Sequence, residues 1–405
     1  WGRRGQGGRW AAVREQVEGS RAVARAVAMC RPQVVAAYPI SPQTHIVEAL
    51  SDLVRTGELA QCEYLTVESE FAAMSACIGA SAVGARAYTA SASQGLLFMA
   101  EAVFNASGLG LPIVMTVANR AIGAPINIWN DHSDAMALRD AGWIQLYAAD
   151  VQEATDLHLQ AFVVAERTSL PVMVCMDGFV LTHAVEEVDL PEQEQVDAFV
   201  PPFVPQQLLD PDDPVTIGAM VGPEAFTEVR YLMQQRMDTA IGTVAEVAHD
   251  FREAFGRSSG GLVRGYRLED ADTVLVTLGS VAGAATEVVD ELREQGIAAG
   301  TLTLTCFRPW PDEAVREALA GARRVVVLER AFSVGRGSIV GQDVRDSLHD
   351  LPVTVVEAVG GLGGRPVRRS DVRRLVEGVA ADLLPTGRLH FLDLDHALLA
   401  SAGVR

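Results

Sequence analysis

Short apolar runs alternate with helix-length amphipathic stretches from about residue 19 to residue 185. Runs typical of strands occupy residues 34–40, 63–68, 86–93, 112–118, 144–149 and 171–177. The runs are almost continuously apolar, whereas a half-exposed strand alternates apolar and polar positions. They therefore predict an open, mostly parallel α/β sheet that is covered by helices on both faces.

The rest of the chain divides into segments of different composition. Residues 186–222 are rich in Pro, Asp and Glu and are expected to wrap the surface, and residues 223–256 to form one long helix or a helix pair. The Gly- and Ser-rich segment 256–270 is the predicted linker. Residues 271–385 repeat the α/β pattern, and the weakly apolar tail, residues 386–405, is expected to dock on a neighbour or on the domain itself. The strand-like runs of this second unit are residues 273–280, 300–307, 323–330 and 352–359.

The beginning of the sequence bears on the location of the protein. Residues 1–18 form a basic N-terminal extension before the first domain, residues 19–255. No apolar segment typical of a secretory signal follows "WGRRGQGGRW". We also find no apolar run near the 18 residues that a membrane-spanning helix needs. The expected location is the cytoplasm.

Charge and composition exclude several kinds of chemistry. The formal net charge of −19 argues against a nucleic-acid partner, which needs a basic face. The chain contains no lysine, so all 33 basic residues are arginine. This excludes lysine Schiff-base chemistry and the lysine of a phosphate-binding P-loop.

Cysteine and histidine spacing gives no metal-binding signature. The five cysteines are far apart and form no C-x-x-C pair, so we expect neither a zinc ribbon nor an iron–sulfur run. The eight histidines include no H-x-x-x-H or H-E-x-x-H spacing. We therefore predict no metal site built by this chain alone.

Ligand-binding and catalytic residues of open parallel sheets lie beyond the carboxyl ends of the strands. In this sequence that rule selects Ser41, Glu68 and Glu70, the segment Ser91–Gln94, and Arg120, which follow four consecutive predicted strands. Each position also has an ordinary structural interpretation, as a turn, a helix-terminal charge, a helix cap or a surface charge. Because these residues would all lie at the same edge of the sheet, we expect them to line one shared crevice.

Two of these positions suit particular chemistry. Glu70 begins a helix of small residues that another backbone can approach closely, and a carboxyl in such a dry interface suits proton exchange with a cofactor nitrogen. Arg120 precedes a long loop and has the two parallel donors of a carboxylate clamp. In that loop Asp131, His132 and Asp134 fit acid–base roles, and loop capping explains them equally well.

Several blocks together resemble the α subunit of the 2-oxoacid:ferredoxin oxidoreductases. The resemblance covers about residues 19–385, and "INIWNDHSD" is more similar to the pyruvate and branched-chain enzymes than to the 2-oxoglutarate type. It implies a thiamine diphosphate pyrimidine-binding-like domain followed by a transketolase C-terminal-like domain. The blocks that carry it are "AYPISPQT", "VESEFAAM", "TASASQGL", "ANRAIGAPINIWNDHSD", "DGFVLTH", "GSVAGAATEVVDELREQGI" and "VGGLGGR".

The resemblance also implies roles for particular residues. Glu70 would contact the aminopyrimidine ring, while Ser41 and Arg120 would engage the substrate; the family often has threonine at the position of Ser41. Asp343 and the glycines of "VGGLGG" are assigned to packing and subunit contact. Further candidates for cofactor contact are Pro39, Ile40, Ser93 and Gln94, and for either ligand Asn119, Asn130, Asp131 and His132.

The implied enzyme is a pyruvate synthase type complex that is active only with its partner subunits. It would convert pyruvate, or a branched-chain 2-oxoacid, with coenzyme A into acyl-CoA, CO₂ and reduced ferredoxin. After "MDGF" at 176–179 this chain lacks the asparagine pair of a diphosphate-binding motif, so a β subunit would hold Mg²⁺ and the diphosphate. Iron–sulfur clusters would lie in a γ subunit and a ferredoxin-like δ subunit, in a dimer of heteromers.

Two other functions remain open from the sequence. One is the pyrimidine-domain subunit of a lipoamide-linked 2-oxoacid dehydrogenase. The other is a non-catalytic assembly subunit that keeps the fold. The presence of Ser41, Glu70 and Arg120 together argues against the assembly subunit.

Overall fold

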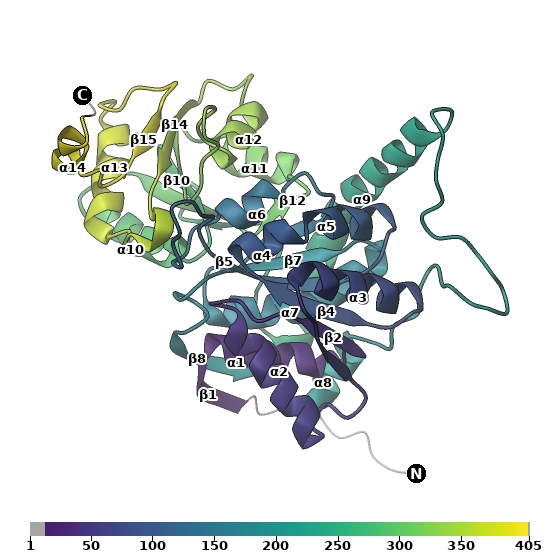
Figure 1. Cartoon of the computed structure of the whole chain (residues 1–405). Helices are drawn as coiled ribbons and strands as arrows, with labels where there is room; N and C mark the ends of the chain where they lie inside the picture. Colours follow the sequence, from purple (N-terminus) through teal and green to yellow (C-terminus); the bar gives the residue numbers. More distant parts are fainter. Residues whose placement is uncertain (1–12, 404–405) are drawn as a thin grey trace, which may run out of the picture.

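The computed structural model describes residues 13–403, so most of the predicted extension 1–18 lies outside the described residues. The first domain is built on a seven-stranded sheet in the order β12-β6-β7-β5-β4-β2-β3 (Figure 1). Neighbouring strands are parallel, except that β12 is antiparallel to β6. The strands are β2 (Val34–Ala37), β3 (Glu63–Thr66), β4 (Ala87–Ser91), β5 (Val114–Asn119), β6 (Ile144–Tyr147), β7 (Val172–Asp177) and β12 (Cys306–Arg308).

Helices cover both faces of this sheet, and β5 and β7 are therefore buried along their whole lengths. The predicted parallel α/β architecture is therefore confirmed. One core cluster packs the first face under α1 (Gly19–Met29), α2 (Thr44–Thr56), α7 (Val151–Thr168), α8 (Gln193–Phe199) and α9 (Phe226–Phe255). A second cluster packs the other face under α3 (Glu70–Ala82), α4 (Ser93–Phe98), α5 (Ala100–Gly108) and α6 (Ser133–Ala137).

The second domain has a six-stranded sheet in the order β15-β14-β13-β10-β11-β9 (Figure 1). Only β9 is antiparallel to its neighbour. Its strands are β9 (Val263–Tyr266), β10 (Thr273–Leu278), β11 (Ala299–Leu304), β13 (Arg324–Glu329), β14 (Thr354–Val359) and β15 (Leu389–Phe391). Its helices are α10 (Val281–Glu294), α11 (Asp312–Leu319), α12 (Val340–Ser347), the 3₁₀ turn η1 (Leu362–Gly364), α13 (Arg369–Ala380) and α14 (His396–Ser401).

The two domains are more closely connected than the predicted boundaries indicate. The strand β12 lies within the segment 271–385 but pairs with β6 at the edge of the first sheet. The predicted linker 256–270 is irregular only in part, because β9 pairs with β11 of the second sheet. The second core cluster also contains buried residues of both domains, among them Met74 and Val276. The domains therefore pack as one body.

Three peripheral segments complete the chain. In segment 186–222, β8 (Val185–Leu190) pairs antiparallel with β1 (Val13–Glu18), and α8 follows. The Pro- and Asp-rich part after α8 contacts the body at Leu209, whose N–H donates to the carbonyl of Ala82, and then extends outward to α9 (Figure 1). The segment 223–256 forms the single helix α9. In the tail, β15 docks on β14 of its own domain.

No helix within residues 13–403 combines the length and the apolar character needed to cross a membrane.

Candidate functional site

The predicted candidates follow four neighbouring parallel strands, β5-β4-β2-β3, and so lie at one edge of the sheet. Two of them are in direct contact across this edge, since Nη1 of Arg120 donates to the carbonyl oxygen of Ser41 at 2.9 Å. The prediction that strand-end residues converge is therefore met for these two. Ser41 itself is exposed, as is Pro39, while Ile40 is partly buried.

Glu70 is the first residue of α3, whose N-cap is Ser69; the Ser69 hydroxyl accepts a hydrogen bond from the N–H of Ala72. Although the Glu70 residue is only 7% exposed, its carboxylate oxygens are not among the fully buried side-chain atoms that lack a partner, so they keep contact with solvent. The side chain lies against the backbone of Gly95, where an added Cβ would lie 2.3 Å from Oε1. Glu70 is thus a largely buried residue whose carboxylate packs against the first turn of α4.

Asp134 ties the β4 loop to the β5 loop. Its Oδ2 accepts the N–H groups of Ser93 and Arg120, both at 2.9 Å. Its Oδ1 accepts Nδ2 of Asn119 at 2.9 Å and the N–H of Ala135 at 2.8 Å. Burial raises the pKa of Asp134, and these hydrogen bonds oppose that shift. Of its two sequence interpretations, the structure gives Asp134 the capping role.

Ser93 and Gln94 open α4 beside Glu70. The hydroxyl of Ser93 donates to the carbonyl of Ala121 at 2.6 Å and also contacts the side chain of Gln94. Gln94 in turn lies over Gly123, where an added Cβ would meet its Nε2 at 2.6 Å. The loops after β4 and β5 are therefore locked together, and they connect the surroundings of Glu70 to Arg120.

Arg120 is 7% exposed, and its guanidinium is held by backbone carbonyls rather than by an acid. Its Nε donates to the carbonyl of Asn127 at 3.3 Å, and Nη2 makes no hydrogen bond to the part of the chain that the structure describes. Burial lowers the pKa of Arg120, opposed by the nearby charge of Asp134. This arrangement leaves one pair of donors for an anionic group.

His132 belongs to a different network, at the junction of the two domains. It pairs with Oδ1 of Asp177 at 2.7 Å, while Oδ2 accepts Nη1 of Arg330 at 2.9 Å and the N–H of Ser280 at 2.8 Å. Burial alone would raise the pKa of Asp177, but the Arg330 guanidinium and the contacts with His132 and Ser280 hold it well below its usual range. Asp177, Ser280 and Arg330 were not among the site residues predicted from the sequence.

The other predicted loop residues also contact the second domain. Oδ2 of Asp131 accepts the N–H of Gly363 at 3.2 Å, and the carbonyl of Asn130 accepts the N–H of Gly364 at 2.8 Å. The glycines of "VGGLGG" thus pack on this loop. Asp343 pairs with Arg308 of β12 at 2.9 Å. These contacts give Asn130, Asp131 and His132 structural roles, and their assignment to a ligand stays a prediction.

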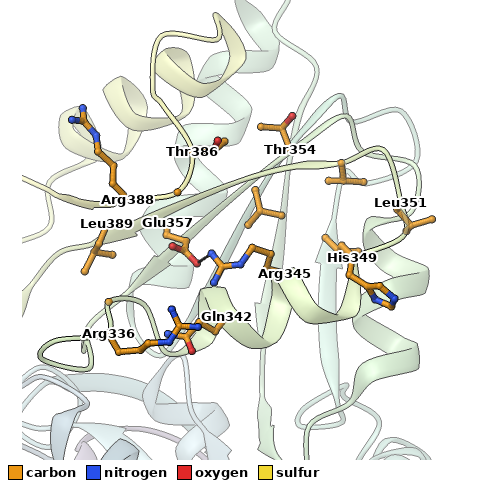
Figure 2. Close-up of a pocket in the computed structure, with 15 residues that line it drawn as sticks. Arg336, Gln342, Arg345, His349, Leu351, Thr354, Glu357, Thr386, Arg388 and Leu389 are labelled. Atoms are coloured by element: carbon orange, nitrogen blue, oxygen red, sulfur yellow. Dashed lines mark hydrogen bonds and ion pairs between the residues drawn. The ribbon is translucent and has the colours of Figure 1, made fainter.

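A cavity of about 700 Å³ lies elsewhere, in the second domain. Figure 2 shows it between α12, β14 and the segment before β15, with Arg336 and Arg388 on its wall and Arg345 paired to Glu357. None of the predicted site residues lines this cavity. The chemistry predicted from the sequence is instead concentrated at the carboxyl edge of the first sheet.

Two family models match the chain. Residues 25–249 match the thiamine diphosphate-binding domain of pyruvate flavodoxin/ferredoxin oxidoreductases, and residues 271–372 match core domain II of pyruvate:ferredoxin oxidoreductase. The chain therefore belongs to the pyruvate flavodoxin/ferredoxin oxidoreductase family. The family membership expected from the sequence motifs is confirmed.

Relatives of known name cover almost the whole chain. It is 48% identical to the pyruvate synthase subunit PorA of Methanosarcina barkeri, over 95% of this chain and 97% of that protein. It is 46% identical to the PorA of Methanocaldococcus jannaschii, over 90% and 94%. It is 39% identical to the ketoisovalerate oxidoreductase subunit VorA of Pyrococcus abyssi, over 93% and 96%.

Solved structures confirm the fold at low sequence identity. A 2-oxoglutarate:ferredoxin oxidoreductase from Magnetococcus marinus, solved with 2-oxoglutarate, coenzyme A and succinyl-CoA, superposes with a TM-score of 0.68 at 18% identity. The match covers 91% of this chain but only 65% of that one. A split-gene transketolase gives 0.54 at 16% identity, over 91% and 99%.

Proposed function

We propose that this chain supplies the pyrimidine side of a thiamine diphosphate site, together with the oxoacid clamp, in a 2-oxoacid:ferredoxin oxidoreductase. The observation that carries the proposal is Glu70, a residue only 7% exposed at the carboxyl edge, whose carboxylate packs against Gly95 of α4. A carboxylate with little solvent contact gains from a hydrogen-bond donor. A ligand nitrogen at this edge would satisfy it.

The residues present fit the cofactor. In the proposed site Glu70 would hold a hydrogen bond to a nitrogen of the aminopyrimidine and would exchange a proton there, while the segment Ser93–Gly95 packs against the carboxylate. When bound, thiamine diphosphate supplies the nucleophilic carbon and the electron sink for decarboxylation. The protein's contribution would be to orient the acid at the first turn of α4.

Arg120 and Ser41 form the proposed carboxylate clamp. The contact between the Arg120 guanidinium and the Ser41 carbonyl fixes the arginine beside the hydroxyl-bearing turn. The remaining guanidinium donors and the Ser41 hydroxyl then hold the carboxylate of a 2-oxoacid. Charge-assisted hydrogen bonds of this kind are the strong ones. Pyruvate is our first substrate, because most of the reported relatives are pyruvate synthase subunits.

The other parts of the enzyme belong to the proposal as well. A β subunit provides Mg²⁺ and the diphosphate side, iron–sulfur clusters lie in γ and δ subunits, coenzyme A takes the acyl group and ferredoxin takes the electrons. The assembly is a dimer of heteromers, and its location is the cytoplasm. Ser93 and Gln94, with Pro39 and Ile40, complete the cofactor side.

Replacing Glu70 by glutamine in the assembled complex tests this proposal. We expect turnover with pyruvate to fall by about 100-fold or more, the contribution of a positioned proton-transfer group, with unchanged assembly on size exclusion. Glu68→Gln is the matched control, since Glu68 is exposed two residues earlier, and it should retain wild-type turnover. Activity of Glu70→Gln within about two-fold of wild type would refute the proposed role.

A further inference from the structure

We propose that Glu18, His45 and His183 form a binding site for a divalent transition-metal ion, with zinc as the expected occupant. One ligand atom from each of these side chains lies within 4.8 Å of the other two. The three residues come from the end of β1, the first turn of α2 and the segment after β7. The inference does not depend on the function proposed for Glu70.

The side chains already converge on one point. Nδ1 of His45 lies 2.6 Å from Oε1 of Glu18, and the imidazole rings of His45 and His183 have their centroids 4.7 Å apart. His45 is the accessible member, with a side chain 47% exposed, whereas that of Glu18 is 20% exposed. An ion can therefore enter from solvent on the His45 side.

The backbone around two of the ligands is fixed. At the start of α1, next to Glu18, the N–H of Gly19 donates to the carbonyl of Ala184 at 2.9 Å, and Ser20 donates to Thr182 from both its N–H and its hydroxyl at 2.8 Å. Gly19 is also pressed against Leu181, whose carbonyl oxygen would lie 1.9 Å from an added Cβ. The segment that carries His183 is thereby attached to the segment that carries Glu18.

The third ligand is positioned by the turn that precedes α2. Pro42 lies against Gly178, where an added Cβ would be 2.6 Å from Cγ of the proline. This contact places the first turn of α2, and with it His45, beside the segment after β7. Helices α1 and α2 lie side by side on the same face of the sheet (Figure 1).

The hydrogen bond and the packing around His183 are also typical of a metal ligand. Nδ1 of His183 is 2.7 Å from the hydroxyl of Thr182, which leaves Nε2 for an ion. The ring of Phe179 packs on His183 at a centroid distance of 4.8 Å, so the imidazole has little freedom to turn. Histidines that ligate metals almost always use their other nitrogen in such a hydrogen bond.

Two imidazoles and one carboxylate are a zinc-binding set that leaves a fourth position open for water or another ligand. In a tetrahedral zinc site, ligand atoms about 2.0–2.1 Å from the metal lie about 3.3 Å from each other. In the structure the ligand atoms of Glu18 and His45 are 2.6 Å apart and all three lie within 4.8 Å of one another, so their separations bracket that spacing. Arg21, whose Nε is 3.6 Å from Oε2 of Glu18, pairs with one carboxylate oxygen and leaves Oε1 on the histidine side.

Histidine spacing in the sequence cannot reveal such a site, because the ligands are 27 and 138 residues apart along the chain. The absence of local motifs therefore excluded only sites made within one helix or loop. The prediction of no metal site rested on that absence alone.

Zinc binding by the full-length chain tests the proposal. The chain is stripped with a chelator, dialysed against micromolar Zn²⁺ and analysed by mass spectrometry for bound metal. We expect one zinc per chain that is lost, or bound at least about 10-fold more weakly, in Glu18→Gln and His45→Asn. Mg²⁺ in excess should not displace it, since magnesium prefers oxygen ligands.

The controls make each outcome decisive. His349→Asn removes an exposed histidine of the second domain and should leave zinc binding unchanged. His45 is half-exposed, so its asparagine variant keeps the fold, which circular dichroism verifies. Equal zinc binding by wild type, Glu18→Gln and His45→Asn would overturn the proposal, as would a wild-type chain that binds no zinc.

Discussion

The position of the Glu70 carboxylate depends on a side chain that is missing. Gly95 has no Cβ, and an added one would lie 2.3 Å from Oε1 and 2.8 Å from Cδ of Glu70. Glycine is needed here for close approach and not for its backbone angles, since Gly95 is not among the residues with positive φ. The Glu70 side chain and the first turn of α4 are therefore packed together.

Gly95→Ala should move the acid without removing it. We expect the turnover of the assembled complex to fall towards that of Glu70→Gln, because the carboxylate can no longer occupy its place. Gly283→Ala is the control, since nothing lies within 4 Å of an added Cβ at that helical position, and it should be neutral or slightly stabilising. Steady-state kinetics and size exclusion provide the comparison; wild-type turnover in Gly95→Ala would show that Glu70 has room to adjust.

Arg120→Ala should act on the substrate. The variant loses a carboxylate clamp, so we expect KM for pyruvate to rise by about 10- to 100-fold with a smaller change in kcat. Ser41→Ala should show the same effect more weakly, because it removes one neutral donor. Steady-state kinetics with pyruvate and coenzyme A separates the two substrates, and Arg323→Ala, an exposed arginine of the second domain, is the control. A change confined to the KM for coenzyme A would contradict the assignment.

Only some of the site residues could be predicted from the sequence. Ser41, Glu70 and Arg120 were found because each follows a strand of a parallel sheet, and the family motifs named the same residues. Gly95 owes its importance to its contact with Glu70, and Asp177 to its contacts with the second domain. Hydrophobic periodicity and local motifs carry no information about such contacts.

At the scale of elements, α7 is joined to the centre of the sheet by a hydrogen-bonded histidine. Nδ1 of His158 donates to the carbonyl of Ala154 at 2.6 Å, and Nε2 accepts from Thr116 of β5 at 2.5 Å. The hydroxyl of Tyr88 of β4 lies 2.6 Å from the same threonine oxygen. Burial lowers the pKa of His158 to about 4, opposed by the backbone hydrogen bond to Ala154.

This histidine should make the fold sensitive to acid. Between pH 6.5 and about 4 the unfolded chain binds a proton that the folded chain does not, so stability falls as the pH falls through this window. The full effect is about 3 kcal/mol. Urea unfolding at pH 7 and pH 4.5 should show a smaller loss of unfolding free energy in His158→Gln than in wild type or in the exposed control His349→Gln. Parallel losses in all three proteins would refute the role of His158.

The elements that the sequence predicted well are the fully buried ones. Apolar runs such as that of β5 and β7 leave no alternative to a covered strand, and their predicted positions agree with the structure within a few residues. The strands β9 and β12 were not predicted, because they are short and pair at sheet edges. Their positions depend on partners in the sheet and not on their own pattern.

At the scale of the whole molecule, Asp177 connects the two domains. It lies at the carboxyl end of β7 in the first domain and is fully buried, with His132 on one oxygen and Arg330 and Ser280 of the second domain on the other. Gly279 next to it leaves no space, since an added Cβ would lie 3.0 Å from His132 and 3.1 Å from Asp177. The apolar cluster shared by both domains surrounds a packed charge network.

Asp177→Asn should therefore loosen the junction of the domains. The amide cannot neutralise Arg330 and offers one acceptor atom to three donors, so we expect the unfolding free energy to fall by about 3–5 kcal/mol, the cost of breaking a buried pair. The native carboxylate stabilises the fold above its unfolded pKa of about 4, and this stabilisation is lost as the pH falls below it, because Arg330 and the hydrogen-bond partners of Asp177 outweigh burial and keep the folded pKa lower. The variant should thus approach wild-type stability in acid.

Urea unfolding followed by tryptophan fluorescence measures both effects, and trypsin cleavage in the segment 256–262 reports on the junction itself. Asp140→Asn is the matched control, since Asp140 has a side chain 76% exposed and should change stability by less than about 0.5 kcal/mol. A loss in Asp177→Asn no larger than that of the control would mean that the shared apolar core alone joins the domains. A large loss of unfolding free energy together with faster cleavage would show that the network holds the second domain firmly against the loop that follows Arg120.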